Sequence, residues 1–174
     1  MNKLGYKSHK PKIYIGTDHA GFELKNELIP FIKKLGYEVV DCGAYKFDKE
    51  DDYPDFVELV AKAVALNPEH NHGIIIGMSG QGEAIVANRF PNVRATVFYG
   101  YSSFFSKDDV IKLGREHNDS NVLSLGAGFI KIKEAKRAVK TWLTTNFSNK
   151  ERHIRRIKKI ERISRDVKNN FDFK

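Results

Sequence analysis

Short runs of β-branched residues alternate along the chain with longer segments in which apolar residues recur at helical spacing. The runs predict five strands, at Lys12–Gly16, Tyr37–Asp41, Ile74–Ile76, Arg94–Phe98 and Val122–Leu125. The other segments predict helices at Phe22–Leu35, Pro54–Leu66, Ala84–Asn88, Ser106–Glu116 and Ile132–Thr144, with a last helix from about Lys150. Strands that alternate with helices in this way are typical of a parallel sheet.

This order predicts an α/β fold of three layers (αβα), in which helices cover both faces of a five-stranded, Rossmann-like parallel sheet. We expect one domain over residues 12–163, preceded by a flexible arm at 1–11 and followed by a polar tail at 164–174. Ligands of such folds bind beyond the carboxyl ends of the strands. Functional residues are therefore expected in the loops that follow the strands.

The composition is that of a globular chain. Hydrophobic residues make up 41% of the 174 residues, and no apolar run approaches the length of a transmembrane helix. The opening residues lack the apolar stretch of a signal peptide, so we expect a cytoplasmic protein. The single cysteine, Cys42, excludes a disulfide within the chain, and we expect it to be packed. His70 and His72 are expected in a solvated loop rather than at a metal.

The net charge of +8 raises the question of nucleic-acid binding. Residues 1–12 carry four lysines and no acid, and residues 150–174 carry ten basic and four acidic residues. The body between them has 16 basic and 18 acidic residues, a net charge of −2. Because the excess charge belongs to the two ends and few aromatic residues accompany it, we do not expect a nucleic-acid partner.

A glycine-rich turn follows the third predicted strand and reads Gly-Met-Ser-Gly-Gln-Gly-Glu over residues 77–83. Glycine lets the backbone approach a ligand closely, and N–H groups at a helix start attract negative charge. The turn therefore predicts an anion site with Glu83 beside it. Its spacing differs from the dinucleotide fingerprint, and it lacks the lysine of a Walker A loop. On this pattern alone, a tight crossover with Glu83 on the surface is an equally good interpretation.

Several segments together resemble one enzyme family. They are Gly-Thr-Asp-His-Ala-Gly at 16–21, the glycine turn with Ala87-Asn88 after it, Asp-Tyr-Pro-Asp at 52–55, Arg-Glu-His-Asn at 115–118 and Arg-His-Ile-Arg-Arg-Ile at 152–157. In this order the chain resembles type B ribose-5-phosphate isomerase. That family also includes isomerases of galactose 6-phosphate and allose 6-phosphate. The resemblance extends from about Lys12 to Glu161.

The resemblance implies an enzyme that interconverts ribose 5-phosphate and ribulose 5-phosphate through an enediolate, without a metal or other cofactor, in the pentose phosphate pathway. It assigns the base to Glu83, because the cysteine that serves as base in another branch is Gly77 here. It assigns ring opening to Asp18 and His117, and it places Ser79 in the loop whose N–H groups stabilise the enediolate. The implied substrate-binding residues are Asp18, His19, Met78, Ser79, Gly80, Gln81, Gly82, Asn118, Arg152 and Arg156, the two arginines holding the phosphate.

The resemblance also implies a homodimer or a dimer of dimers, because the site of this family lies at a subunit interface. His117, Asn118 and the two arginines would then act in the site of the partner. The last predicted helix carries an isoleucine at every third position from Ile154 to Ile163. Such a stripe favours a face that packs on a second subunit.

Two positions depart from the family pattern. Met78 stands where a second glycine is usual, and Gly128 stands where an arginine that binds phosphate is expected. One charge-assisted contact of that kind contributes roughly 1.5 to 3 kcal/mol, so phosphate affinity is the property in question. Arg89 or Lys131 can also take the place of the missing arginine.

Alternatives are open at this point. A hexose-6-phosphate isomerase has the same motifs, and Gly128 also suits a sugar-phosphate-binding homologue with weak activity. Single residues have structural interpretations too. Asp18 and His19 can cap a loop, and His117 can interact with the dipole at the end of a helix.

Overall fold

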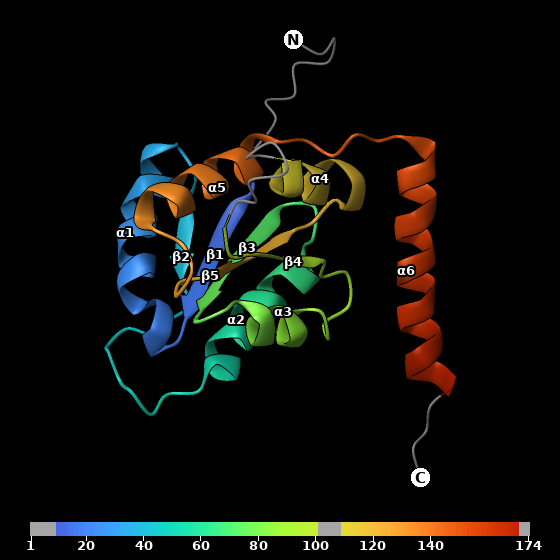
Figure 1. Cartoon of the computed structure of the whole chain (residues 1–174). Coiled ribbons are helices and arrows are strands. Elements are labelled where there is room, and N and C mark those ends of the chain that lie inside the picture. The colour runs from blue at the N-terminus through green and yellow to red at the C-terminus, as the bar shows by residue number, and fades with distance from the viewer. Residues whose placement is uncertain (1–9, 101–108, 171–174) are drawn as a thin grey trace.

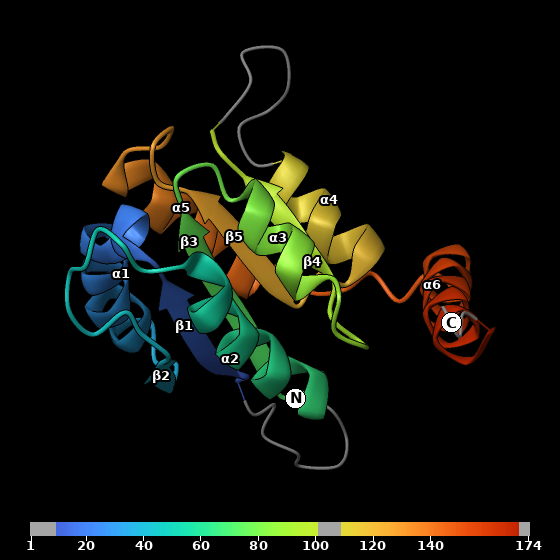
Figure 2. The ribbon, with the colours of Figure 1, turned by 90° about the horizontal axis from the view of Figure 1, so that it is seen from below.

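The computed structural model describes residues 10–100 and 109–170. Five strands form one parallel sheet in the order β2-β1-β3-β5-β4, and they are β1 (Lys12–Thr17), β2 (Val39–Asp41), β3 (Asn71–Gly77), β4 (Ala95–Phe98) and β5 (Val122–Gly126). Helices α1 (Phe22–Lys34), α4 (Asp109–Asn118) and α5 (Ile132–Thr144) cover one face, and α2 (Tyr53–Leu66) and α3 (Gln81–Ala87) cover the other (Figure 1 and Figure 2). The predicted three-layer α/β fold is confirmed.

The isoleucine run of the central strand enters two cores, one on each face of the sheet. Ile74 and Ile76 belong to the core under α1 and α5, whereas Ile75 belongs to the core under α2. All three side chains are fully buried. A strand covered on both faces needs an apolar residue at every position, which is why this segment is a continuous run and not an alternating one.

Some details differ from the sequence prediction. β3 begins at Asn71, because Asn71 and His72 pair with Lys12 and Ile13 of β1. The expectation that His72 lies in a solvated loop is therefore wrong. Its ring centroid lies 5.2 Å from that of Trp142, and burial lowers its pKa to about 3. Cys42 is packed as expected, and burial raises its pKa to about 11.

The chain ends of the fold are only partly described. The predicted arm lies outside the described residues apart from Lys10 and Pro11, and so does the predicted helix start at Ser106. At the other end, α6 (Glu151–Asn170) continues through most of the segment predicted as a tail. None of the helices in the described ranges combines the length and the apolar character that crossing a bilayer requires.

The direction of winding reverses between β1 and β3. β2 lies on one side of β1 and β3 lies on the other, so the loops after β1 and β3 lead away from each other. Such a switch point leaves a crevice at the carboxyl edge of a parallel sheet. Thr17 Oγ1 donates a hydrogen bond to Ile76 O at 2.8 Å, which holds the ends of the two strands together.

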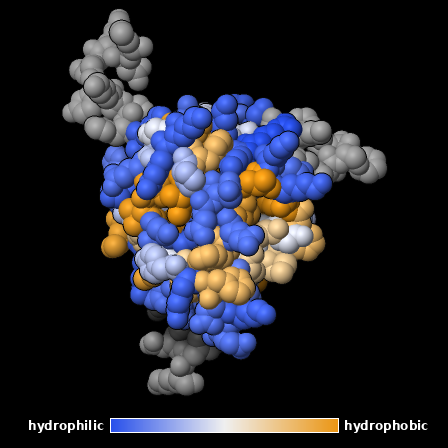
Figure 3. All heavy atoms as spheres, turned by 90° about the vertical axis from the view of Figure 1, so that its left-hand side faces the viewer, coloured by the Kyte–Doolittle hydropathy of each residue, from blue (hydrophilic) through white to orange (hydrophobic). Residues whose placement is uncertain are grey.

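α6 stands beside the β4 edge of the sheet and covers neither face (Figure 1). Arg94 Nη1 of the body contacts Glu161 Oε1 of α6 at 3.3 Å. Ile160 and Ile163 on this helix are 49% and 55% exposed. The opposite side of the molecule presents hydrophilic residues with several apolar groups between them (Figure 3). The isoleucine stripe of α6 is thus only partly covered by the rest of the chain.

Candidate active site

The predicted site residues that follow β1 and β3 meet at the carboxyl edge of the sheet. Asp18 is buried, and its Oδ1 accepts a hydrogen bond from Ala20 N at 3.0 Å. This contact caps a short 3-10 helix, η1 (His19–Gly21), as the structural interpretation of Asp18 expected. Asp18 also lies near enough to Glu83 for its charge to raise the pKa of the Glu83 carboxyl. Capping therefore places Asp18 beside the glycine turn.

Glu83 is buried in the first turn of α3, with 5% of its surface exposed. The interpretation of Glu83 as a surface acid is therefore wrong. Burial is the main cause that raises the pKa of its carboxyl, and the charge of Asp18 adds to it. A carboxylate with a raised pKa is a better general base for a carbon acid than an ordinary one.

Gly77, the last residue of β3, makes room for that carboxylate. A Cβ atom at position 77 would lie 1.6 Å from Glu83 Oε1 and 2.2 Å from Glu83 Cδ. The Glu83 carboxylate thus fills the space that a side chain at position 77 would take. A side chain at Gly77 and a carboxylate in this position are mutually exclusive.

The glycine turn is held by its carbonyl oxygens. Gly77 O accepts a hydrogen bond from Ala127 N at 2.8 Å, and Met78 O accepts one from Gly128 N at 2.9 Å. Gly80 O accepts one from Ser124 Oγ at 2.6 Å. In the described part of the chain, the N–H groups of Met78, Ser79 and Gly80 have no acceptor. The loop after β5 therefore fixes the turn through its carbonyl oxygens and leaves three consecutive N–H donors available, as a site for a developing oxyanion requires.

The backbone conformation of Gly80 and contacts of Ser79 and Gly82 complete the description of the turn. Gly80 adopts a φ of 77°, a left-handed conformation that favours glycine. Ser79 Oγ accepts a hydrogen bond from Gln81 N at 3.3 Å. The Tyr53 hydroxyl lies against Gly82, since a Cβ atom there would be 2.8 Å from Tyr53 Oη. Tyr53 packs against the core under α2, and it also lines the turn.

His19 is positioned by Asp51, a residue that sequence reasoning missed. Asp51 Oδ1 accepts hydrogen bonds from His19 N at 3.0 Å and from His19 Nδ1 at 2.7 Å. This bond is the main cause that raises the pKa of the His19 imidazole. Asp51 belongs to an acidic turn 32 residues away in the chain, and no local pattern links the two.

Asp18, His19 and Asp51 also place ligand atoms within 4.8 Å of one another, which is a spacing that a metal ion can use. The ion pair between His19 and Asp51 accounts for this cluster without a metal, because Asp51 Oδ1 already contacts two groups of His19. Carboxylate oxygens and an imidazole nitrogen can also form hydrogen bonds with a sugar hydroxyl.

The remaining predicted residues lie at the opposite edge. His117 and Asn118 end α4, directly before β5, and so they lie at the amino end of that strand. Five strand residues span about 17 Å, and Glu83 lies beyond the other end of the sheet. Arg152 and Arg156 are exposed on α6, near the end of α4. A single chain therefore does not bring these four residues to Glu83.

His153 connects the members of this second group and was not singled out by the sequence. Its ring centroid lies 4.3 Å from that of His117. Its Nε2 accepts a hydrogen bond from Arg152 Nε at 3.0 Å. The side chain is 1% exposed, although it follows an exposed arginine in a helix with many charges.

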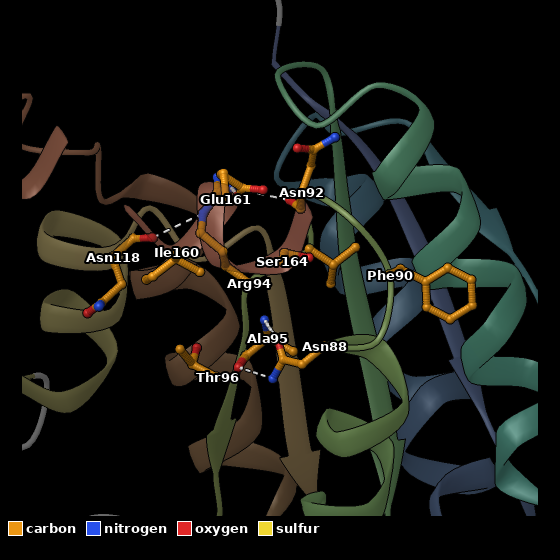
Figure 4. Close-up of a pocket in the computed structure, with 11 residues that line it drawn as sticks. Asn88, Phe90, Asn92, Arg94, Ala95, Thr96, Asn118, Ile160, Glu161 and Ser164 are labelled. Carbon is orange, nitrogen blue, oxygen red and sulfur yellow. Dashed lines mark hydrogen bonds and ion pairs between the residues drawn. The ribbon is translucent and has the colours of Figure 1, made fainter. Parts of the chain in front are cut away.

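A groove of about 310 Å³ separates α6 from β4 (Figure 4). Asn118, Arg94 and Ile160 line it, and no residue of the glycine turn does. Its charged groups are already paired, because Arg94 contacts both Asp119 and Glu161. Asn88, also in its wall, bonds the backbone of Ala95 through both side-chain atoms. This groove therefore lacks a free base and is distinct from the crevice at the carboxyl edge.

The structure couples the two departures from the family pattern. Met78 is 61% exposed, and its thioether lies over Gly128. A Cβ atom at position 128 would be 2.3 Å from Met78 Sδ and 3.1 Å from Met78 O. Any side chain at position 128 therefore competes with Met78 for the same space.

Comparisons with known proteins identify relatives of this chain. The sequence model of a family described as Ribose/Galactose Isomerase matches residues 13–160. Ribose-5-phosphate isomerase B of Escherichia coli (strain K12) is 37% identical over 152 residues, which are 87% of this chain and 95% of that protein. The same enzyme of Mycolicibacterium paratuberculosis is 36% identical over 146 residues, which are 84% and 87% of the two chains.

Solved structures show the same likeness. Ribose-5-phosphate isomerase B from Mycoplasma genitalium, with bound ribulose 5-phosphate, superposes with a TM-score of 0.82 at 35% identity and covers 89% of this chain and 97% of its own. The protein from Clostridium thermocellum gives 0.80 at 40% identity, covering 90% and 99%. By the match over residues 13–160 and these relatives, the chain belongs to the Ribose/Galactose Isomerase family.

Proposed function

We propose that this protein interconverts ribose 5-phosphate and ribulose 5-phosphate through an enediolate, with Glu83 as the base. The observation that carries the proposal is the buried Glu83 carboxylate with a raised pKa, placed one turn after a row of N–H groups that lack an acceptor in the described part of the chain. A base and an oxyanion site side by side are what an aldose-ketose isomerisation needs. The names of the relatives support the choice of substrate.

In the proposed reaction, Glu83 removes the proton from C2 of the open-chain aldose, and the electrons of the C1 carbonyl move onto O1. The N–H groups of Met78, Ser79 and Gly80 stabilise that charge. Protonated Glu83 then delivers its proton to C1, while the hydroxyl proton of O2 passes to O1 and the carbonyl forms at C2. One carboxylate serves both carbons, and no metal takes part.

The other predicted residues act before and around this step. Asp18 and His117 open the sugar ring, while His19 and Asn118 contact the substrate. Asp51 supports His19, because its bond to Nδ1 fixes the orientation of the ring and leaves Nε2 for the substrate. Arg152 and Arg156 hold the phosphate, and the binding energy of that remote group aligns the reacting carbons.

We infer that the protein acts as a homodimer or a larger assembly of dimers. His117, Asn118 and the arginines lie at the far edge of the chain that carries them, so a partner has to bring its own set to each Glu83. The half-exposed Ile160 and Ile163 on the protruding helix supply an apolar face for that contact. A phosphorylated substrate and a single unpaired cysteine support a cytoplasmic location.

The test is the turnover of ribose 5-phosphate by the Glu83→Gln variant. We expect a loss of kcat of well over tenfold, because glutamine keeps the shape of the side chain but cannot accept the proton. Turnover within about tenfold of the parent would refute the assignment. Specificity constants for ribose 5-phosphate, allose 6-phosphate and galactose 6-phosphate decide between a pentose and a hexose substrate.

A further inference from the structure

His153 has both ring nitrogens occupied by groups of different kinds. Nδ1 lies 2.7 Å from Ser148 Oγ, in the segment between α5 and α6. Nε2 accepts from Arg152 Nε at 3.0 Å. The face of the ring contacts His117, with an angle of 46° between the two planes. One buried side chain therefore touches two residues that the proposed reaction uses.

The arginine determines where the His153 proton sits. A guanidinium only donates hydrogen bonds, so Nε2 must be the unprotonated nitrogen and the proton must lie on Nδ1. Nδ1 then donates to Ser148 Oγ. Burial, and next the neighbouring His117 and Arg152, lower the pKa of the imidazole. His153 is thus held as a neutral ring with its acceptor turned towards Arg152.

This bond orients the useful edge of the arginine. Because Nε is bound to His153, rotation of the guanidinium plane is restricted, and the edge formed by the two Nη groups is left for another ligand. Neither Nη group is paired with a carboxylate in the described ranges of the chain. An oriented guanidinium with a free edge loses less entropy when it binds a phosphate than a mobile one does.

We propose that His153 is a positioning residue that holds the Arg152 guanidinium and the His117 imidazole in one fixed relation. The proposal rests on the proposed function, since it gives Arg152 to phosphate binding and His117 to ring opening. His153 itself is 1% exposed, and we assign it no contact with the substrate. It links the phosphate-binding group and the ring-opening group, so that a partner's site receives them as one unit.

His72 offers a matched control. It is also a histidine shielded from solvent with a lowered pKa, and its ring contacts an aromatic side chain, that of Trp142. It lies near the amino end of β3 and contacts no proposed site residue. If His153 only fills space in the fold, His153→Phe and His72→Phe should have similar consequences.

The experiment compares His153→Phe, His153→Gln and His72→Phe. Phenylalanine keeps the ring but accepts no hydrogen bond, whereas the glutamine Oε1 can reach the position of Nε2. For His153→Phe we expect KM for ribose 5-phosphate and the dissociation constant of inorganic phosphate to rise about tenfold or more. His153→Gln should recover most of that loss, and His72→Phe should leave both values unchanged. Titration calorimetry with inorganic phosphate gives a readout that does not depend on turnover.

A double-mutant cycle isolates the link to the arginine. In an Arg152→Ala background, His153→Phe should cause no further loss of phosphate affinity, because the oriented group is already absent. Additive losses, or equal phosphate affinity of His153→Phe and His72→Phe, would overturn the proposal. Neither result would touch the isomerase assignment, which fails only if Glu83→Gln keeps its turnover.

Discussion

The contact between Gly77 and Glu83 yields the sharpest test of the geometry of the base. Gly77→Ala adds a single methyl group at the end of the central strand. That Cβ atom would lie 1.6 Å from Glu83 Oε1, whereas Cβ atoms essentially never come within 3.0 Å of a heavy atom from a residue that is not adjacent in the chain. Gly77 pairs with Gly126, and its strand lies between β1 and β5, so the carboxylate has to move and not the backbone.

The expected effect follows from the size of that displacement. The carboxylate must shift by well over an ångström, and a displacement of roughly 1 Å in a catalytic group costs about 100-fold in rate. We therefore expect kcat for ribose 5-phosphate to fall by about 100-fold or more, which corresponds to about 2.7 kcal/mol of lost transition-state stabilisation. Steady-state kinetics in both directions, together with thermal unfolding, measure the activity and the integrity of the fold.

Gly114→Ala is the control. Its added Cβ atom would meet Thr96 Oγ1 at 3.4 Å, an ordinary contact, and α4 is a helix in which alanine stabilises by about 0.5 to 1 kcal/mol relative to glycine. We expect this variant to keep its kcat and to unfold at a slightly higher temperature. A folded Gly77→Ala protein with kcat within about threefold of the parent would contradict the proposed position of the base.

Further predictions concern affinity and stability. Gly128→Arg alone should not lower KM for ribose 5-phosphate, because the new Cβ atom would lie 2.3 Å from Met78 Sδ. The double variant Met78→Gly with Gly128→Arg should lower KM by about tenfold or more. Equal KM values for the single and double variants would show that the two positions are independent. Glu83→Gln should raise the unfolding temperature at pH 7, because folding raises the pKa of Glu83 and so disfavours its charged form. An unfolding temperature below that of the parent would contradict this expectation. Acidification from pH 6.5 to 5 should lower the free energy of unfolding by about 2 kcal/mol through His72 alone. In the unfolded chain His72 takes up a proton at about pH 6.5, whereas in the folded state, where its pKa is about 3, it stays neutral. Denaturant unfolding of the parent and of His72→Phe at both pH values tests this, and parallel pH dependences would exclude His72 as the cause.

Much of the fold could be predicted because its determinants are local. The isoleucine run at 74–76 needs cover on both faces, and regular alternation of strands and helices leaves few topologies other than a parallel sheet. The boundary error at His72 arose because that residue is polar, and only its pairing with Ile13 makes it part of the strand. Pairing partners of a strand lie outside any local window, and so its ends are the least predictable part.

The features of the site could likewise be predicted only where they depend on residues close together in the sequence. The form of the glycine turn could be predicted because its seven residues are consecutive in the chain, and its role as an anion site stays a prediction. The burial of Glu83 against Gly77 could not be predicted, since it depends on how α3 packs against β3. The contact between Asp51 and His19 and the role of His153 depend on residues brought together only by the folded chain. For His117 and Arg152, even one folded chain leaves them far from the base.

The most direct test of the central proposal follows the C2 proton itself. Ribose 5-phosphate labelled with deuterium at C2 is incubated with the parent and with Glu83→Gln, and loss of the label from C2 is followed by NMR, whether it passes to C1 or to solvent. If Glu83 is the base, the parent removes the label and Glu83→Gln does so at least about 100-fold more slowly while it still binds the sugar phosphate. Removal of the label by Glu83→Gln at the rate of the parent would contradict the assignment.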